Sequence, residues 1–180
     1  MDNVKYQPAL RYIHFGLIIF GITGFLSGEL AEDEAVIGYW VHATLGILLL
    51  FVIVTRIIVG FSASEQLNLK KWWKTITVYK KTVKEDIKTL MELNLPHRKL
   101  HEGIAGLVQL TGLLGFSWMC ITGVLILVVD INRLDTIKEL VYEVHEIGES
   151  VVLAFLFLHI GAVIAHYFKG ENLLKRINPF

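Results

Sequence analysis

Three histidines lie in a stretch of the chain that is apolar enough to enter a bilayer. The stretch is Glu143–Phe168, and its histidines are His145, His159 and His166. An ionisable side chain is costly in hydrocarbon unless a partner satisfies it, and neutral imidazole is a common metal ligand. The stretch therefore raises the question of what binds these imidazoles.

The spacing of the histidines predicts two cross-helix pairs. His145 and His159 are 14 residues apart, so on an α-helix they lie about 40° from the same direction and about 21 Å apart along the axis. His14 and His42 lie near the starts of two other apolar runs, on opposite sides of the predicted membrane. His14 can therefore pair with His159, which we call the inner pair, and His42 with His145, which we call the outer pair.

Two imidazoles from facing helices are the ligand set of a haem iron with histidine on both axial positions. A structural zinc ion needs about four ligands at one depth, whereas each depth here offers two. An iron with two histidine ligands has no open position, which favours electron transfer over oxygen binding. The pattern thus predicts two haems b, with metal ligands His14 and His159 for one and His42 and His145 for the other.

Four long apolar runs must position these histidines. The chain has 180 residues, 54% of them hydrophobic, with a mean hydropathy of +0.56, and roughly 20 apolar residues cross a bilayer core. The sequence predicts an all-α integral membrane four-helix bundle in a single domain, 1–180, with spans at about 9–28, 35–60, 102–129 and 145–168. We expect the first span to be retained rather than removed as a signal peptide.

Positive charge is sorted between the two ends of the predicted bundle, although the formal net charge is zero. Fifteen of the seventeen Lys and Arg residues fall on the side of the termini and the 62–102 loop, and only Arg133 and Lys138 lie opposite. The positive-inside rule then places both termini in the cytoplasm. The loops on the outer side are acidic.

The segment 69–95, between the second and third spans, has the pattern of a basic amphipathic helix. Its apolar residues recur at steps of three and four, and lysines occupy the other faces. We expect this helix to lie at the cytoplasmic membrane surface, held by anionic lipids. Docking of a cytoplasmic partner is the alternative.

Further polar residues are candidates for contacts with haem or quinone. Arg11 and Arg56 lie at the cytoplasmic level and could pair with haem propionates, or anchor helix ends by snorkelling. His166 could contact a propionate or a quinone, or simply end its helix at the interface. His97 and His101 precede the third span, where a surface role and a quinone site are both open.

Glycines in all four spans could serve either of two purposes. They could leave room for a bulky planar cofactor, or they could let membrane helices pack closely. The sequence does not separate the two interpretations for Gly21, Gly24, Gly46, Gly112, Gly115 and Gly161.

Over nearly its whole length the chain resembles the bacterial cytochrome b561 family, which includes the cytochrome b subunits of membrane nickel–iron hydrogenases. The resemblance rests on LRYIHFGL, on WVHATLGILLLFVIVTRIIVGF and most of all on VHEIGESVVLAFLFLHIGAVIAHYFKGENLLKR. It implies a four-helix bundle in the bacterial inner membrane, two b haems on the same histidine pairs, and electron exchange with the quinone pool. The long 62–102 loop looks more like the hydrogenase-type subunits.

We therefore expect an electron-transfer cytochrome b subunit of an oxidoreductase. It would link a periplasmic redox protein or catalytic subunit to quinone, in contact with membrane lipids and with no nucleic-acid partner; oligomerisation stays open. A superoxide oxidase is an alternative, but the acidic outer loops would repel an anion. A histidine-lined metal or ion transporter is another, although the predicted spans contain no interior carboxylate.

Overall fold

The computed structural model describes residues 5–32, 36–61, 68–69, 80–92, 94–96 and 103–180. These residues form helices and no strand, and four of the helices are long and apolar enough to cross a membrane. The four are α1 (Pro8–Leu26), α3 (Val36–Gly60), α6 (Gly103–Asn132) and α7 (Asp135–Phe168). The shorter helices are α2 (Gly28–Glu32), α5 (Lys80–Met91) and α8 (Leu174–Ile177). The predicted all-α, multi-pass four-helix bundle is confirmed.

The helix bounds agree with the predicted spans within about three residues, except at the start of α7. This helix begins at Asp135, ten residues before the predicted span. At 1.5 Å per residue its 34 residues extend about 51 Å, which is longer than the roughly 30 Å hydrocarbon core. The charged turns before His145 therefore continue the helix beyond the membrane.

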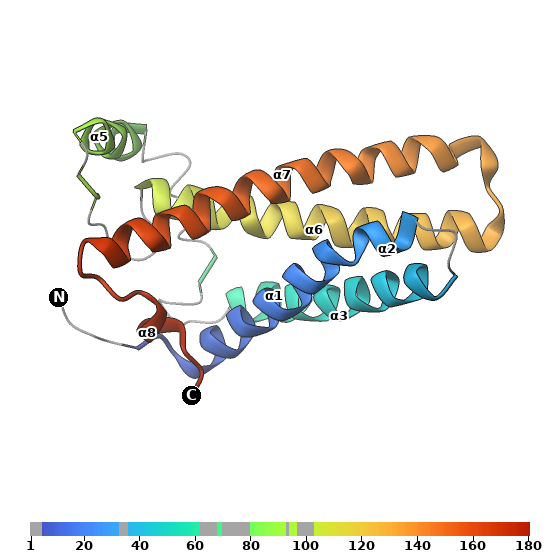
Figure 1. Cartoon of the computed structure of the whole chain (residues 1–180), viewed down its shortest axis with the longest axis horizontal. Coiled ribbons are helices and arrows are strands. Elements are labelled where there is room, and N and C mark those ends of the chain that lie inside the picture. The colour runs from blue at the N-terminus through green and yellow to red at the C-terminus, as the bar shows by residue number, and fades with distance from the viewer. Residues whose placement is uncertain (1–4, 33–35, 62–67, 70–79, 93, 97–102) are drawn as a thin grey trace.

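The four long helices form two antiparallel hairpins that meet along one side. In Figure 1, α1 lies along α3, and α6 lies along α7. Packing of α3 against α6 joins the hairpins, and among the described residues α7 has no comparable packing against α1 or α3. The start of α1 and the C-terminus lie at the same end of the bundle, beside α8. We call this the termini end and the opposite end the α2 end.

The buried core lies where the two hairpins meet. Leu49 and Ile53 of α3 pack there against Phe116 and Cys120 of α6, together with Val152 of α7. Many other large apolar side chains point outward from the four long helices. Because no water is available in a bilayer core and lipid tails are apolar, this outward surface is suited to lipid contact.

A Schellman motif closes α6 at the tip of the second hairpin. The Leu134 N–H donates to Val129 O (3.0 Å), and the Arg133 N–H donates to Asp130 O (3.3 Å). This pattern requires a left-handed residue after the helix, and Arg133 adopts it with φ of 51°. A glycine would carry this conformation without the steric cost that Arg133 bears.

Only part of the predicted amphipathic segment 69–95 falls among the described residues. The described part includes α5, whose Ile87 and Leu90 side chains are exposed. Asp86, also in α5, is almost fully buried and accepts a hydrogen bond from the Ile104 N–H (3.0 Å) at the start of α6. Residues 70–79 and the predicted candidates His97 and His101 lie outside the described residues.

Candidate functional site

The structure brings together the two histidines of the inner pair near the termini end. The ring centroids of His14 on α1 and His159 on α7 lie 6.1 Å apart, with 48° between the ring planes. Phe155, one turn before His159, stacks on the His159 ring at 5.3 Å and 20°. Nδ1 of His14 is buried, with no hydrogen-bond partner among the described residues.

The outer pair has nearly the same separation near the α2 end. The ring centroids of His42 on α3 and His145 on α7 lie 6.3 Å apart, with 85° between the ring planes. His14 and His42 each lie six residues after the first residue of their helix, about 9 Å along its axis. Because α1 and α3 start at opposite ends of the bundle, the two pairs lie at opposite depths.

Hydrogen bonds fix the tautomer of the His42 ring and allow the same tautomer in the His145 ring. Nδ1 of His42 lies 3.1 Å from the Gly24 carbonyl, which can only accept, so this nitrogen carries the proton. Nδ1 of His145 lies 2.7 Å from Thr122 Oγ1, and that hydroxyl can donate to Trp118 O (2.9 Å). His145 Nδ1–H can therefore donate to Thr122. With the proton on Nδ1, Nε2 of each ring has the lone pair that a metal needs.

The ring separations fit one metal ion between the two imidazoles of each pair. With metal–nitrogen bonds of about 2.0–2.1 Å and about 1.1 Å from each bound nitrogen to its ring centroid, opposed ligands have centroids about 6.3 Å apart. The observed values are 6.1 and 6.3 Å. Among the described residues, no group of three or more His, Cys, Asp or Glu side chains is placed to share a metal ion.

Both pairs cross the boundary where α7 faces the first hairpin. The described helices do not pack closely along this boundary, so a planar group could enter it without displacing a packed helix contact. A cavity lies at its outer part, lined by His42 and by side chains of α1, α3, α6 and α7. The lining also includes four glycines, Gly21, Gly24, Gly46 and Gly123.

The glycines divide between the two purposes that the sequence left open. A Cβ at Gly112 would overlap the Phe155 ring, and one at Gly21 would lie 3.1 Å from Phe116, so these two serve close packing. A Cβ at Gly24, Gly46 or Gly161 would meet no atom within 4 Å. The open glycines are those suited to leave room for a bulky group.

A second cavity lies beside His14 at the termini end. It is bounded by Phe15 and Ile18 of α1 and by the C-terminal residues Asn172, Lys175 and Asn178, among others. The chain after α7 therefore folds back and forms one wall of the space next to the inner pair.

Contacts with the first residues of the chain hold this C-terminal segment in place. The Tyr6 N–H donates to Arg176 O (3.0 Å), and the Phe180 ring meets the Phe15 ring edge-on at 5.8 Å. Nη1 of Arg11, a predicted propionate partner, donates to Asn178 O at 3.0 Å. Arg11 thus lies beside this segment, and its contact with a propionate stays a prediction.

The two other predicted contact residues lie in different surroundings. Arg56 is buried in α3 with 4% of its surface exposed, four residues before the end of the helix. His166 Nδ1 lies 2.9 Å from Glu171 Oε2, across the turn in which Gly170 (φ 85°) follows α7. This contact fits a role in ending the helix, and contact of His166 with haem or quinone stays untested.

Sequence reasoning missed the residues that surround the outer pair. Ser27, Thr122 and the Gly24 carbonyl contact its imidazoles, and Tyr39 and Asp130 bond to each other nearby. A Thr or Tyr in an apolar run carries no periodic signal that would single it out. The spacing of Tyr39 and Tyr142, each three residues before a predicted ligand, is the signal that could have found part of this group.

Comparison with family models gave a match over nearly the whole chain. A family model described as prokaryotic cytochrome b561 matches residues 5–179, nearly the whole chain. Comparisons with the curated proteins and with the solved structures gave no match. The family resemblance inferred from the three sequence stretches is confirmed.

Proposed function

The chain belongs to the prokaryotic cytochrome b561 family, and from this premise we propose that it binds two b-type haems, one between the histidines of each pair. Membership implies a membrane protein that transfers electrons by b-type haem. The proposal adds the number of haems and their ligands. His14 and His159 bind the inner haem, and His42 and His145 bind the outer haem.

The observation that carries the proposal is the separation of the rings in both pairs. Two residue pairs at two depths have centroid distances of 6.1 and 6.3 Å, which match two imidazoles on opposite sides of one metal ion. Both pairs cross the same open boundary, and the hydrogen bonds of the outer pair leave Nε2 for the metal. Both pairs include a histidine of α7, so the repeated separation supports one shared purpose for the four histidines.

Bound haem would supply the reversible one-electron chemistry of its iron. The two histidines of each pair would hold the iron and would leave it no open position for a substrate. The Gly24 carbonyl and Thr122 orient the outer imidazoles and make them stronger ligands for the metal. Phe116 and Phe155, whose rings meet edge-on at 5.9 Å, help fill the core between the two levels and exclude water from it.

We further propose that electrons pass between a periplasmic redox protein or catalytic subunit at the α2 end and quinone at the termini end. The sorting of positive charge supports a cytoplasmic position for both termini in a bacterial inner membrane. Quinone is supported by the resemblance to family members that exchange electrons with the quinone pool. A separate catalytic subunit is supported by the likeness of the long 62–102 loop to hydrogenase-type subunits.

The first test is a haem count on detergent-purified protein from cells supplied with haem. A reduced-minus-oxidised absorption spectrum and a pyridine haemochrome assay should give two b haems per chain, low-spin in both redox states. One haem per chain would contradict one of the two pairs. Absence of haem would overturn the proposal.

The quinone link needs a separate measurement. The reduced protein should be reoxidised rapidly by a water-soluble quinone analogue, and inside-out and right-side-out vesicles should differ in access for a membrane-impermeant reductant. Normal haem content with no reaction toward quinone would keep the haem proposal and reject the quinone link.

A further inference from the structure

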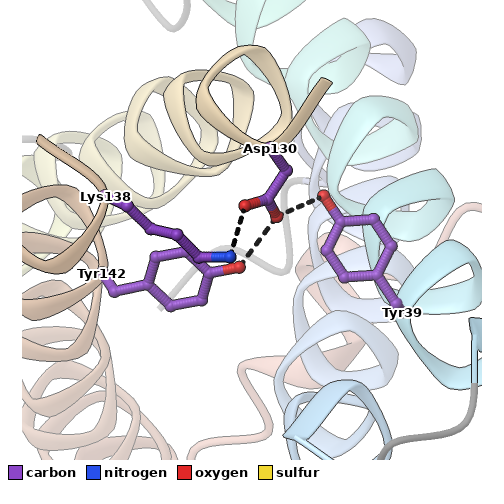
Figure 2. A network of polar contacts seen from close by, with 4 residues as sticks. All are labelled: Tyr39, Asp130, Lys138 and Tyr142. Carbon is purple, nitrogen blue, oxygen red and sulfur yellow. Dashed lines mark hydrogen bonds and ion pairs between the residues drawn. The ribbon is translucent and has the colours of Figure 1, made fainter. Parts of the chain in front are cut away.

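A cluster of polar side chains, most of them partly buried, connects three of the four long helices at the α2 end. Asp130, in the last turn of α6, accepts hydrogen bonds at Oδ2 from the hydroxyls of Tyr39 on α3 (3.1 Å) and Tyr142 on α7 (2.8 Å). Its Oδ1 forms an ion pair with Lys138 Nζ of α7 at 3.1 Å. Figure 2 shows the carboxylate between the two tyrosines, which approach it from opposite sides. We call these four residues the Asp130 cluster.

Each of the two tyrosines has the same spacing in the sequence from one outer histidine. Tyr39 precedes His42 by three residues, and Tyr142 precedes His145 by three residues. Residues three apart on a helix lie on neighbouring positions of one face. Tyr39 and His42 line the same cavity. Each outer histidine therefore has, one turn closer to the α2 end, a tyrosine that reaches the same carboxylate oxygen.

The cluster joins helices that do not otherwise pack closely. Among the described residues, α7 packs on α6 but not along α3, although the outer pair lies between α3 and α7. Because one oxygen of Asp130 accepts both hydroxyls, it sets the spacing of these helices close to the imidazoles. Hydrogen bonds to a carboxylate are shorter and stronger than those between neutral groups, and Lys138 offsets the carboxylate charge.

We propose that Asp130 is a positioning residue for the outer pair, acting through Tyr39 and Tyr142 to fix the separation and relative rotation of the His42 and His145 rings. The effect on the outer haem rests on the proposed function, whereas the effect on the spacing of α3 and α7 does not. Without the cluster, the start of α3 and the first turns of α7 would be linked, as far as the structure describes the chain, only through the packing of each helix on α6. The outer haem would then be held less firmly, while the inner haem, about 21 Å further along α7, would be unaffected.

The test uses the double variant Tyr39→Phe with Tyr142→Phe in the full chain. These changes remove two hydroxyls but keep both rings and the Asp130–Lys138 ion pair, so charge stays constant. Tyr167→Phe is the matched control, because Tyr167 is an exposed tyrosine on α7 outside the Asp130 cluster. Asp130→Ala is the companion variant, and its effect should not add to that of the double variant because both break the same network.

The readout on the haem-loaded protein is the low-spin electron paramagnetic resonance signal of each haem, together with the rate of haem loss to an acceptor protein. In the double variant the outer signal should shift or broaden and outer haem should be lost about 10-fold faster, as for other residues that orient metal ligands. The inner signal and the Tyr167→Phe control should match the unmodified protein. An unchanged outer signal with an unchanged loss rate would overturn the proposal.

A second readout does not depend on haem. Spin labels at Val41→Cys on α3 and Leu140→Cys on α7, both exposed, report the distance between these helices in haem-free protein that carries Cys120→Ala. The distance distribution should be broader in the double variant than in the Tyr167→Phe control, and equal distributions would overturn the proposal. Unmodified protein that binds no haem would reject the proposed function, while the label distances would still decide the role of Asp130.

Discussion

His14 and His159 face each other with ring centroids 6.1 Å apart, although they come from the first and the last membrane-spanning helices. The approach follows from topology, because α1 starts at the termini end and α7 finishes there. Their separation leaves room for one metal ion between the rings, and the same holds for His42 and His145.

Removal of one histidine from a pair should cost that pair's haem alone. We expect His14→Gly and His42→Gly each to leave about one haem per chain, because an iron with a single fixed ligand is held weakly. Added imidazole should restore the missing absorption, since it can occupy the vacated ligand position. Tyr167→Ala is the control, because Tyr167 is exposed on α7 and its loss should leave the haem count at two. Loss of both haems from either glycine variant would contradict independent sites.

The two haems should differ in their electron paramagnetic resonance signals. The imidazole planes are 48° apart in the inner pair and 85° apart in the outer pair. When axial ring planes are nearly perpendicular, two iron d orbitals become nearly equal in energy and the g anisotropy grows. We expect the oxidised protein to show two low-spin signals, the larger maximum g value belonging to the outer site. The assignment is checked in the His42→Gly protein, which should lose the more anisotropic signal.

Filling the outer cavity should exclude its haem without unfolding the protein. A Cβ at Gly46 would meet no atom within 4 Å, so Gly46→Leu should be tolerated by the helices while its side chain occupies the cavity. We expect loss of the outer haem, retention of the inner haem and normal yield in the membrane. Two haems in purified Gly46→Leu protein would show that this cavity is not where haem binds.

Gly112→Ala should destabilise the protein and leave both haems bound. Its Cβ would overlap the Phe155 ring, and overpacking of this kind costs about 1–3 kcal/mol. We expect a lower unfolding temperature in detergent with the haem count still at two. An unfolding temperature equal to that of the unmodified protein would mean that Phe155 can move aside without cost.

The hydrogen bond from His145 to Thr122 should tune the outer haem. Thr122→Val keeps the shape of the side chain but removes the oxygen that lies 2.7 Å from His145 Nδ1. We expect a shifted outer midpoint potential and about 10-fold weaker outer haem binding, measured by redox titration and haem transfer. Thr111→Val is the control, because the Thr111 hydroxyl bonds to Leu107 O of its own helix. Equal behaviour of the two variants would remove any special role for Thr122.

Arg133→Gly should stabilise the α6–α7 hairpin. Arg133 holds φ at 51°, and a left-handed backbone costs a residue with a side chain about 1 kcal/mol more than glycine. For a chain of this size that gain corresponds to an unfolding temperature about 2–4 °C higher. Arg133→Ala removes the same charge but keeps the strained backbone, so it should give no gain. A gain of equal size in both variants would assign the effect to charge.

The fold and the histidine pairs could be predicted because both depend on simple periodicity. The length of apolar runs gave four spans, and the helical repeat placed His145 and His159 on one face. The extra turns of α7 before His145 could not be predicted from hydropathy. Charged residues such as Lys138 and Glu139 give this segment the hydropathy of a loop. A helix can continue into water when it packs against a neighbour, as α7 does against α6.

The partners of the outer pair could not be predicted because they depend on the rotation of three helices about their axes. The three-residue spacing of Tyr39 and Tyr142 from the outer histidines could single out these two residues, but it does not show that both side chains meet at Asp130. The wall formed beside His14 by the C-terminal segment likewise depends on tertiary contacts, such as that of Phe15 with Phe180. Contacts of this kind form only in the folded chain, so helical spacing cannot predict them.

The division into two hairpins also bears on how the protein is assembled. The α1–α3 and α6–α7 hairpins can each insert as a unit, and in the described part of the chain the α3–α6 packing and the Asp130 cluster then link them before cofactor arrives. A ligand that spans the open boundary binds the closed arrangement and not the separated hairpins, so it shifts assembly by mass action. At a free ligand concentration 100 times the dissociation constant this linkage is worth about 2.7 kcal/mol for each site. Supply of cofactor would then limit how much of the newly made chain reaches its mature form and escapes proteolysis.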